Sequence, residues 1–360
     1  MPAFCLLADP RTYRPCPINM REDIAFREHW IEHFGTHFDL VMRLAIEQYG
    51  PAAAQRAQAC KDDMLQELAA IRAQPTRWGE LDLMVLEVLR QHKLRVHGLP
   101  DPFQNTKARE NAAMLAQYPA LVAELDGHAV DSPQRQLLLL VEGVFAGNIF
   151  DLGTAATAQR YADESPDFIH VRDSLEGKRP WLVDHLDAWS ARLLDAPGGV
   201  GGYRKAVLFL DNAGSDFLLG VLPLARWLAR RQVRVVLAAN MLPALNDVTI
   251  TELPGLLQQA AAVDPVLADQ LAAGLITAVD SGGIAPLIDL RHISDALNAA
   301  AADADLVILE GMGRAVGSNF DAQFSVDSVK ICMVKDPIIA GRLGGRTFDT
   351  VLRFDPGGRR

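Results

Sequence analysis

The sequence predicts an α/β protein in which a mainly helical first half precedes an open, mainly parallel sheet. Two observations predict this class. Up to about residue 195, apolar residues recur at helical spacing and β-branched runs are few. After the glycine-rich stretch at 195–202, short runs of Val, Leu and Ile alternate with helical segments, which is the pattern of βα units. We therefore expect two domains, at residues 1–200 and 201–360.

The first half is expected to be built from helices. Its segments with apolar residues near helical spacing are 21–47, 53–72, 79–94, 107–125 and 134–147. In the second half, the Ala-rich segments near 259–273 and 296–304 are expected to be helices that cover the sheet. The predicted strands are 206–210, 233–239, 275–279, 305–309, 329–334 and 349–354.

Most of the predicted strands end in a polar or charged residue. These residues are Asp211 with Asn212, Asn240, Asp280, Glu310 and Lys335. In open parallel sheets, ligands bind in the crevice beyond the carboxyl ends of the strands. The sequence therefore predicts one crevice lined by acids, amides and a lysine, which suits a divalent metal and an anionic substrate.

Composition narrows the class of protein and of partner. The net charge of −10 argues against a general binder of nucleic acid or of anionic membranes. The hydrophobic fraction of 49% fits a globular protein, and no stretch reaches the length of a membrane span. The cysteines are scattered, without a CxxC pair, which favours a reduced cytoplasmic location. The oligomeric state cannot be inferred from the sequence.

The first candidate site follows the first strand. Asp211 and Asn212 are adjacent oxygen-bearing side chains that can point into one crevice as ligands of a hard cation. Gly214 allows a tight turn, and Ser215 or Asp216 can cap the helix that follows. The alternative is that Asp211 and Asn212 are only turn and capping residues.

The second candidate site follows the second strand. Asp247 would lie beside Asp211 and Asn212 if the two strands are neighbours, and Asn240 ends the strand itself. Such oxygen ligands, with waters and a substrate phosphate, would complete an octahedral Mg²⁺ or Mn²⁺ site. The alternative is that Asp247 or Thr249 caps the helical run near residue 252.

Glycines follow the strand that ends in Glu310. Gly311, Met312 and Arg314 belong to a segment whose backbone N–H groups can hold phosphate oxygens. The segment does not match a dinucleotide fingerprint, because Val316 occupies the position of the third glycine and the segment follows a late strand. A Rossmann cofactor is therefore not expected.

Lys335 ends an apolar strand, where a buried ammonium is costly unless it pairs in the crevice. A phosphate or Glu310 would offset that cost, whereas an exposed strand-end lysine is the alternative. His29, His33 and His37 share one helix face at four-residue spacing. They lack the order of a metalloprotease motif, so we interpret them as structural.

Several blocks of the sequence, in this order, resemble the damage-control phosphatases, also known as domain of unknown function 89. The blocks lie at 101–103, 107, 110–111, 147–151, 211–214, 246–249, 310–313 and 335. The segment 343–346 resembles the branch of that family fused to pantothenate kinases. The resemblance covers about residues 20–355 and has no kinase part, so we expect a stand-alone member.

The resemblance implies a fold, an activity and roles for residues. It implies a Rossmann-like three-layer α/β/α core preceded by an N-terminal helical bundle domain. It also implies a metal-dependent phosphatase of small phosphorylated metabolites, with phosphopantetheine or its damaged forms as the substrates of the fused branch. Carried over residue by residue, the family's metal ligands are Asp211, Asn212 and Asp247. Its phosphate-site residues are Glu310, Gly311, Met312 and Lys335, while Asn148 and Asp151 match a further block. Asp336 stands where that branch would have an amide.

We thus expect a phosphomonoesterase that uses Mg, Mn, Co or Ni, with Asp211, Asp247 and Lys335 as catalytic residues. Arg314 and Asn240 complete the candidate substrate-binding residues. Asp247 or Asp216 would orient the attacking water. Two alternatives stay open. One is a carboxyl methyltransferase that uses S-adenosylmethionine, although no glycine-rich loop follows the first strand. The other is a metabolite-binding module without catalysis.

Overall fold

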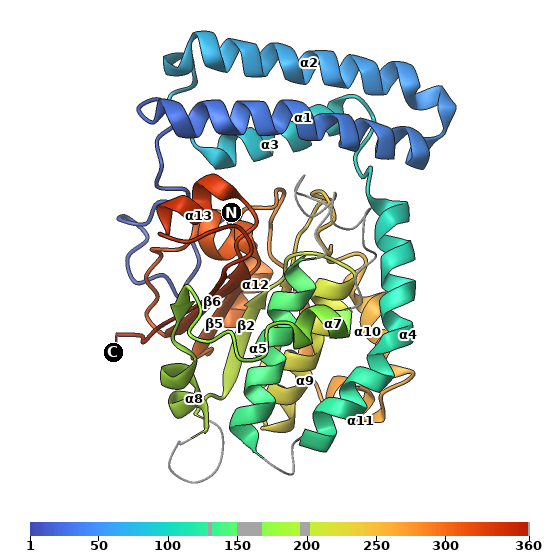
Figure 1. Ribbon diagram of the computed structural model, residues 1–360, viewed down its shortest axis with the longest axis vertical. Coiled ribbons are helices and arrows are strands. Elements are labelled where there is room, and N and C mark those ends of the chain that lie inside the picture. Colours follow the sequence, from blue (N-terminus) through green and yellow to red (C-terminus); the bar gives the residue numbers. More distant parts are fainter. Residues whose placement is uncertain (129–131, 150–167, 195–201, 359–360) are drawn as a thin grey trace.

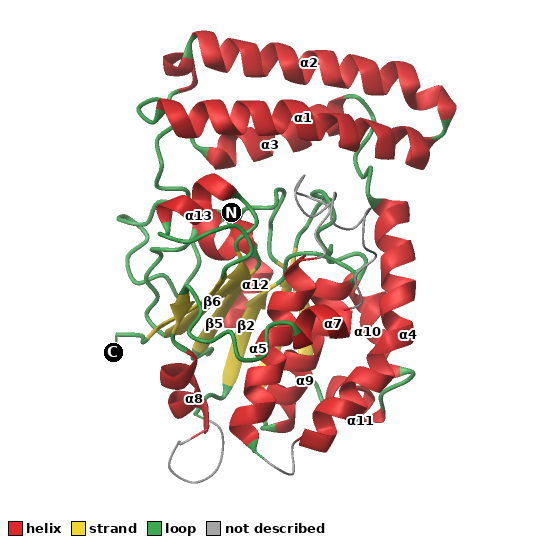
Figure 2. Ribbon diagram, viewed as in Figure 1, coloured by secondary structure: helices red, strands yellow, loops and turns green. Residues whose placement is uncertain are grey.

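One seven-stranded sheet, with helices on both faces, forms the centre of the computed structural model (Figures 1 and 2). The structure describes residues 1–128, 132–149, 168–194 and 202–358. The order of the strands is β1-β7-β6-β5-β2-β3-β4. Their bounds are β1 (Val183–Asp184), β2 (Lys205–Phe209), β3 (Arg234–Ala239), β4 (Ile276–Asp280), β5 (Leu306–Glu310), β6 (Asp327–Met333) and β7 (Thr350–Asp355).

The sheet is mainly parallel, as predicted. Strands β2 to β6 pair in parallel with their neighbours, whereas β7 runs antiparallel to β6 and parallel to β1. Each predicted strand is found within about two residues of its expected bounds. β1 was not predicted, because a strand of two residues is too short to show alternation.

Alternate side chains of the strands enter two separate hydrophobic cores. In β2, Ala206 and Leu208 belong to one core, and Val207 and Phe209 belong to the other. This follows from the two-residue period of a strand. Helices α4, α5, α8, α9, α10 and α11 cover the first core, while α12, α13 and the N-terminal segment cover the second. The predicted three-layer architecture is therefore confirmed.

The five helices predicted in the first half are found within about four residues of their expected bounds, whereas the segment 259–273, predicted as one helix, is divided between two. The bounds of the helices are α1 (Ile24–Tyr49), α2 (Ala54–Ala73), α3 (Leu83–Val96), α4 (Gln104–His128), α5 (Pro133–Ile149), α7 (Phe168–Asp173), α8 (Leu186–Leu194), α9 (Leu222–Arg230), α10 (Leu253–Ala261), α11 (Pro265–Ala272), α12 (Asp295–Ala301) and α13 (Pro337–Arg342). Two π-helical turns, η3 (Asp216–Val221) and η4 (Met312–Ser318), follow β2 and β5. None of the described helices is long and apolar enough to cross a membrane.

Helices α1, α2 and α3 form a layer of their own, at the top of Figure 1. The Asp23 carboxylate caps α1 by accepting a hydrogen bond from the Phe26 N–H at 2.9 Å. Buried Phe26, Trp30, Phe34 and Phe38 recur every four residues, so α1 buries one stripe of its surface. The stripe belongs to the second core and continues that core into this layer.

Helices α4 and α5 precede residue 200 and share the first core with the sheet and α9. In Figure 1, α4 descends along the side of the molecule from the layer of α1 to α3. The first half of the chain thus contributes both to the upper layer and to one face of the sheet. The division into domains at residue 200 stays a prediction.

Glycines allow α5 to pack closely against η3. A Cβ atom on Gly147 would lie 2.8 Å from the Asp216 Cα and 2.9 Å from the Ser215 carbonyl oxygen. Both of these are backbone atoms, which cannot move aside as a flexible side chain would. This close approach places Asn148, the next residue of α5, beside the carboxyl ends of the strands.

We predict that Gly147→Ala destabilises the protein. The added methyl group would meet backbone on two sides, and overpacking of this kind costs about 1–3 kcal/mol. Gly127→Ala is the matched control, because it lies in α4 with nothing within 4 Å of the added Cβ. The control should leave the free energy of unfolding unchanged or raise it by up to about 1 kcal/mol. Equal unfolding free energies for the two variants in urea titrations would contradict this account of the packing.

Candidate active site

The site lies where the order of the strands reverses. From β2 the chain proceeds outward through β3 and β4, and then returns to place β5 on the other side of β2. Ligands of open α/β sheets bind at this switch point. Asp211 follows β2 and Glu310 ends β5, and the Asp211 N–H donates to the Glu310 Oε2 at 3.0 Å. The strand topology therefore brings together two acids that are far apart in sequence.

A third acid joins them. Asp216 begins η3, and ligand oxygens of Asp211, Asp216 and Glu310 all lie within 4.8 Å of one another. We call these residues the acid cluster. All of them are buried, with Asp211 the most exposed at 6%. Among the described residues, the Asp216 Oδ1 has no hydrogen-bond partner.

Two side-chain amides hold the acid cluster together. The Asn148 Nδ2 donates to Asp216 at 3.0 Å and to Glu310 at 3.2 Å. The Asn212 Nδ2 donates to Asp216 at 2.9 Å and to Asp211 at 3.1 Å. Asn148 is itself oriented, because its Oδ1 accepts a hydrogen bond from the Met333 N–H at 3.2 Å. Neutral donors alone cannot balance several ionised carboxylates in a dry site.

Burial raises the pKa of Asp211 and of Glu310 well above their ordinary values, and it also raises the pKa of Asp216. The neighbouring carboxylates add to this effect for Asp211 and Glu310, since like charges disfavour ionisation. A divalent cation would remove that penalty, because carboxylate oxygens are the ligands that hard cations prefer. The oxygen-rich donors and the unpartnered Asp216 oxygen fit such an ion.

Arg314 joins the acid cluster to Asp247. Its Nη1 pairs with Asp211, and its Nη2 donates to the Asp247 Oδ2 at 2.8 Å. The Asn240 Nδ2 donates to the same Asp247 oxygen, also at 2.8 Å. Arg314 is 1% exposed, so this is a buried pairing of one cation with two acids. Removing Arg314 would leave uncompensated charge in the interior.

Gly311 is required by the close approach of the strand ends. Its φ is +89°, and a Cβ atom there would lie 2.1 Å from the Asp211 Oδ2. Only glycine adopts this conformation without strain and leaves room for the carboxylate. This requirement explains the glycine that directly follows Glu310.

Helix α4 fixes the two loops that carry the acids. The Asn111 Oδ1 accepts from the Gly214 N–H at 2.8 Å, which anchors the loop after β2. Lys107 lies one helical turn earlier and pairs with Asp101 at 3.0 Å and Glu252 at 2.8 Å. Its Nζ also lies 3.5 Å from the Asp247 carbonyl oxygen. The first half of the chain thus positions residues of the second.

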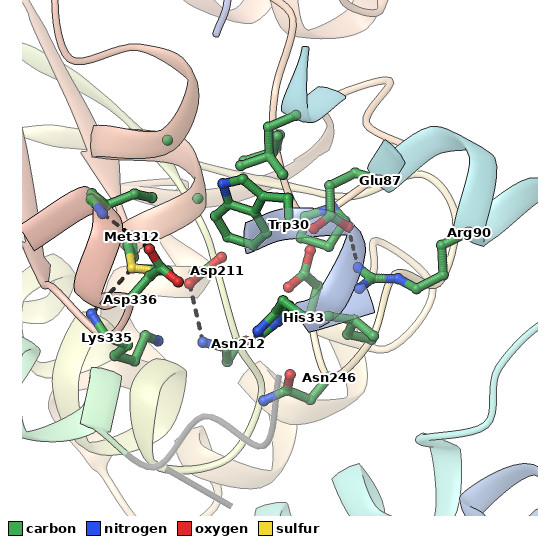
Figure 3. Close-up of a pocket in the computed structure, with 18 of the residues that line it drawn as sticks. Trp30, His33, Glu87, Arg90, Asp211, Asn212, Asn246, Met312, Lys335 and Asp336 are labelled. Atoms are coloured by element: carbon green, nitrogen blue, oxygen red, sulfur yellow. Dashed lines mark hydrogen bonds and ion pairs between the residues drawn. The ribbon is translucent and has the colours of Figure 1, made fainter. Parts of the chain in front are cut away.

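A cavity of about 290 Å³ opens above these groups (Figure 3). Its lower wall contains Asp211, Asn212, Asp247 and Lys335. Its upper wall comes from the layer of α1 to α3 and includes His29, Trp30, His33, Glu87 and Arg90. Most of the remaining lining is apolar and includes Leu83, Leu245, Leu287, Met312, Pro337 and Ile339.

Lys335 is buried and is fixed at the lower wall. Its Nζ donates to the Asn148 carbonyl oxygen at 2.9 Å, at the carboxyl end of α5. Its N–H meets the Met312 sulfur at 3.2 Å. The ammonium thus lies near the acid cluster, as expected for a lysine that does not extend into solvent.

The structure divides the predicted site residues into two groups. Asp211, Asn212, Asp247, Met312 and Lys335 line the cavity. The others are not in the cavity lining: Glu310 belongs to the acid cluster, Asn148, Gly311 and Arg314 lie against that cluster, and Asn240 contacts Asp247. Asp151 lies outside the described residues. The roles assigned to all of these residues stay predictions.

Two features of the site were not anticipated. Sequence reasoning did not group Asp216 with Glu310, because a helix and a separate strand bring them together. It also did not place His29 and His33 on the cavity wall. The His29 Nε2 pairs with the Asp336 Oδ2 at 2.6 Å, and burial lowers the pKa of His33 to about 4. Their spacing alone carries no signal of a cavity, and the structural interpretation of His33 stays a prediction.

The fold and this site define a family. The family model described as damage-control phosphatase ARMT1-like domain matches residues 38–351, and the chain belongs to this family. A damage-control phosphatase of Arabidopsis thaliana, At2g17340, is 40% identical over 85% of this chain and 81% of its own length. The mouse 4'-phosphopantetheine phosphatase is 29% identical over 97% of this chain and 48% of its own length.

Other relatives are longer proteins. The chain is 39% identical to pantothenate kinase 2 of Arabidopsis thaliana, over 98% of this chain. It spans only 42% of that relative. A crystal structure of a DUF89 family protein from Pyrococcus horikoshii has a TM-score of 0.60 at 14% identity. It covers 89% of this chain and 95% of its own, and this likeness concerns the fold.

We predict that the acid cluster makes stability depend on pH in the metal-free protein. A carboxyl whose pKa is raised on folding keeps its proton to a higher pH in the native state than in the unfolded chain. The contribution of this carboxyl to the free energy of unfolding is therefore most favourable below its pKa in the unfolded chain, about 4. The contribution is lost as the pH rises through its pKa in the folded protein. Asp216→Asn removes one such group, so the unfolding free energy of this variant should fall less steeply than that of the wild type as the pH rises above about 4.

The variant Asp216→Asn should keep the hydrogen bonds that surround this side chain. The Asp216 Oδ2 accepts the bonds from Asn148 and Asn212, and an asparagine oxygen can keep them. Asp269→Asn, exposed on α11, is the matched control. Denaturant unfolding in chelator would measure both. Parallel pH profiles for wild type and Asp216→Asn would show that the cluster does not have the raised pKa values.

Proposed function

We propose that this chain is a metal-dependent phosphomonoesterase of small phosphorylated metabolites. The observation that carries the proposal is the buried acid cluster, of which Asp211 reaches the wall of a cavity that Lys335 also lines. Membership of a phosphatase family and the names of two relatives support it. Acids alone would repel a phosphate, so a cation and the lysine are what make this cavity suitable for an anionic ester.

Asp211 would be the central ligand of the cation. The resemblance pairs it with Asn212 and Asp247, whereas proximity pairs it with Asp216 and Glu310. The Asn212 side chain turns its nitrogen towards Asp211 and Asp216, so its oxygen would have to face the ion for Asn212 to act as a ligand. When bound, a divalent cation polarises a phosphoryl oxygen and acidifies a water.

The remaining chemistry belongs to the chain's own residues. Lys335 would hold phosphoryl oxygens and stabilise the charge that develops on them. Asp247 lies on the cavity wall with one oxygen fixed by Arg314 and Asn240, so its carboxylate is oriented before the substrate arrives. We assign Asp247 the task of orienting the attacking water. The upper helices would exclude bulk water from the reacting groups.

Phosphopantetheine or a damaged derivative is the substrate class that we propose. The mouse relative is named for that phosphate ester. The cavity has a volume of about 290 Å³, and much of its lining is apolar apart from the acids below and the polar residues of α1 and α3 above, so it suits a short aliphatic chain better than a large polar one. We also propose a cytoplasmic location, in keeping with the free cysteines of the described chain.

Removal of metal should abolish turnover. We expect phosphatase activity to vanish in chelator and to return with Mg²⁺, Mn²⁺, Co²⁺ or Ni²⁺, because the acid cluster needs a counter-charge before an anionic ester can bind. A panel of phosphorylated metabolites, assayed with each metal in turn, would measure this. Full activity of the chelated, metal-free protein would refute the proposal.

Two substitutions should separate metal binding from phosphate binding. Asp211→Asn removes one ligand charge, so calorimetry should show weaker metal binding and turnover should fall. Lys335→Met keeps the apolar stem, so metal binding should persist. Its kcat/KM should fall by the factor that corresponds to a loss of about 2–4 kcal/mol of transition-state stabilisation. Asp269→Asn and Lys178→Met, at exposed positions, are the matched controls. The opposite pattern, with metal affinity lost only in Lys335→Met, would reverse the two roles.

A further inference from the structure

Asn246 lies on the cavity wall, one residue before Asp247 (Figure 3). Its backbone is fixed, because its carbonyl oxygen accepts from the Ala213 N–H at 2.9 Å. The preceding residue, Leu245, has a φ of 53°, which is uncommon for a residue with a side chain. The loop is thus held in a conformation that directs the Asn246 side chain to the cavity.

The Asn246 carboxamide has no hydrogen-bond partner in the part of the chain that the structure describes. Both Nδ2 and Oδ1 are unpartnered, although the residue is only 1% exposed. Buried polar groups of native proteins are nearly always paired, since each unpaired one costs about 1–3 kcal/mol. The neighbouring Asn212 and Asn240 follow that rule. Asn246 is therefore a polar group that the fold leaves for a ligand.

The chemistry of a carboxamide limits what that ligand is. It presents a donor and an acceptor side by side, which match the carbonyl and N–H groups of another amide. A sugar also carries donors and acceptors, but it would need several polar partners around it. Apart from the acids and Lys335 of the lower wall, much of the cavity lining is apolar and includes Leu287 and Leu245, the residue before Asn246. An amide within an aliphatic chain fits this surface better than a polyol does.

We infer that Asn246 recognises an amide in the leaving group of the substrate. The inference rests on the proposed phosphatase function, because it places the phosphate beside Asp211 and Lys335. Asn246 and Asp247 are consecutive, with Cα atoms about 3.8 Å apart. The recognised amide therefore lies within a few bonds of the phosphoester oxygen. Asn246 is thus a specificity residue for aliphatic amide phosphates.

The first test compares two substrates. Asn246→Leu keeps similar volume and removes both polar atoms. We expect the ratio of kcat/KM for phosphopantetheine to that for p-nitrophenyl phosphate, which has no amide, to fall about tenfold. Glucose 6-phosphate is the third substrate, because its leaving group is a polyol without an amide. An unchanged ratio, or a selective loss for glucose 6-phosphate, would overturn the inference. Asn105→Leu, exposed on α4, is the matched control and should keep the wild-type ratio.

The second test does not depend on catalysis. Calorimetry with pantetheine, which has no phosphate, should show binding to the wild type and about tenfold weaker binding to Asn246→Leu. If the wild type binds pantetheine more tightly than Asn246→Leu does but hydrolyses no ester, the proposed function fails and only the contact between Asn246 and an amide stands. If it hydrolyses esters but binds pantetheine no better than Asn246→Leu does, the inference fails alone.

Thermal stability distinguishes a role of Asn246 in substrate recognition from a structural role. Replacing an unpaired buried amide by leucine should not lower the thermal midpoint, because no hydrogen bond within the protein is lost. A lower midpoint in Asn246→Leu, together with equal losses for every substrate, would show a structural residue and overturn the proposal.

Discussion

The burial of several carboxylates at one point is the constraint on which the rest of this structure depends. Asp211, Asp216 and Glu310 lie close enough to bind one ion, at the switch point of the sheet. Such a group is unfavourable by itself, since desolvation and like charge both oppose ionisation. A folded protein that buries such a group must offset this unfavourable free energy, and side chains from the surrounding helices and loops do so.

Compensation comes from each layer of the fold. Helix α5 provides the side chain of Asn148, and the carbonyl oxygen of the same residue orients Lys335. The turn η4 provides Arg314, which binds acids from two different loops. Helix α4 anchors those loops through Asn111 and Lys107. The layer of α1 to α3 then closes the cavity above the charges, so that electrostatic interactions within it are strong.

Much of this could be predicted from the sequence, and the reasons for the rest are physical. A strand that ends in a polar residue signals the rim of a parallel sheet, so Asp211, Glu310 and Lys335 were recognisable from local pattern alone. The contact between Asp216 and Glu310 depends on how η3 packs against α5, which no local period encodes. The positions of His33 and Asn246 on the cavity wall likewise depend on tertiary placement. Only the structure reveals that the Asn246 amide is unpartnered.

The most direct test of the central claim is the position of a bound metal. Crystals of this protein grown with Mn²⁺ would show the ion by anomalous scattering, without reference to any activity. We predict a peak in contact with the Asp211 carboxylate, with further ligands from Asp216 and Glu310 or from Asn212 and Asp247. The absence of a peak at Asp211, in crystals with Mn²⁺ present, would contradict the account.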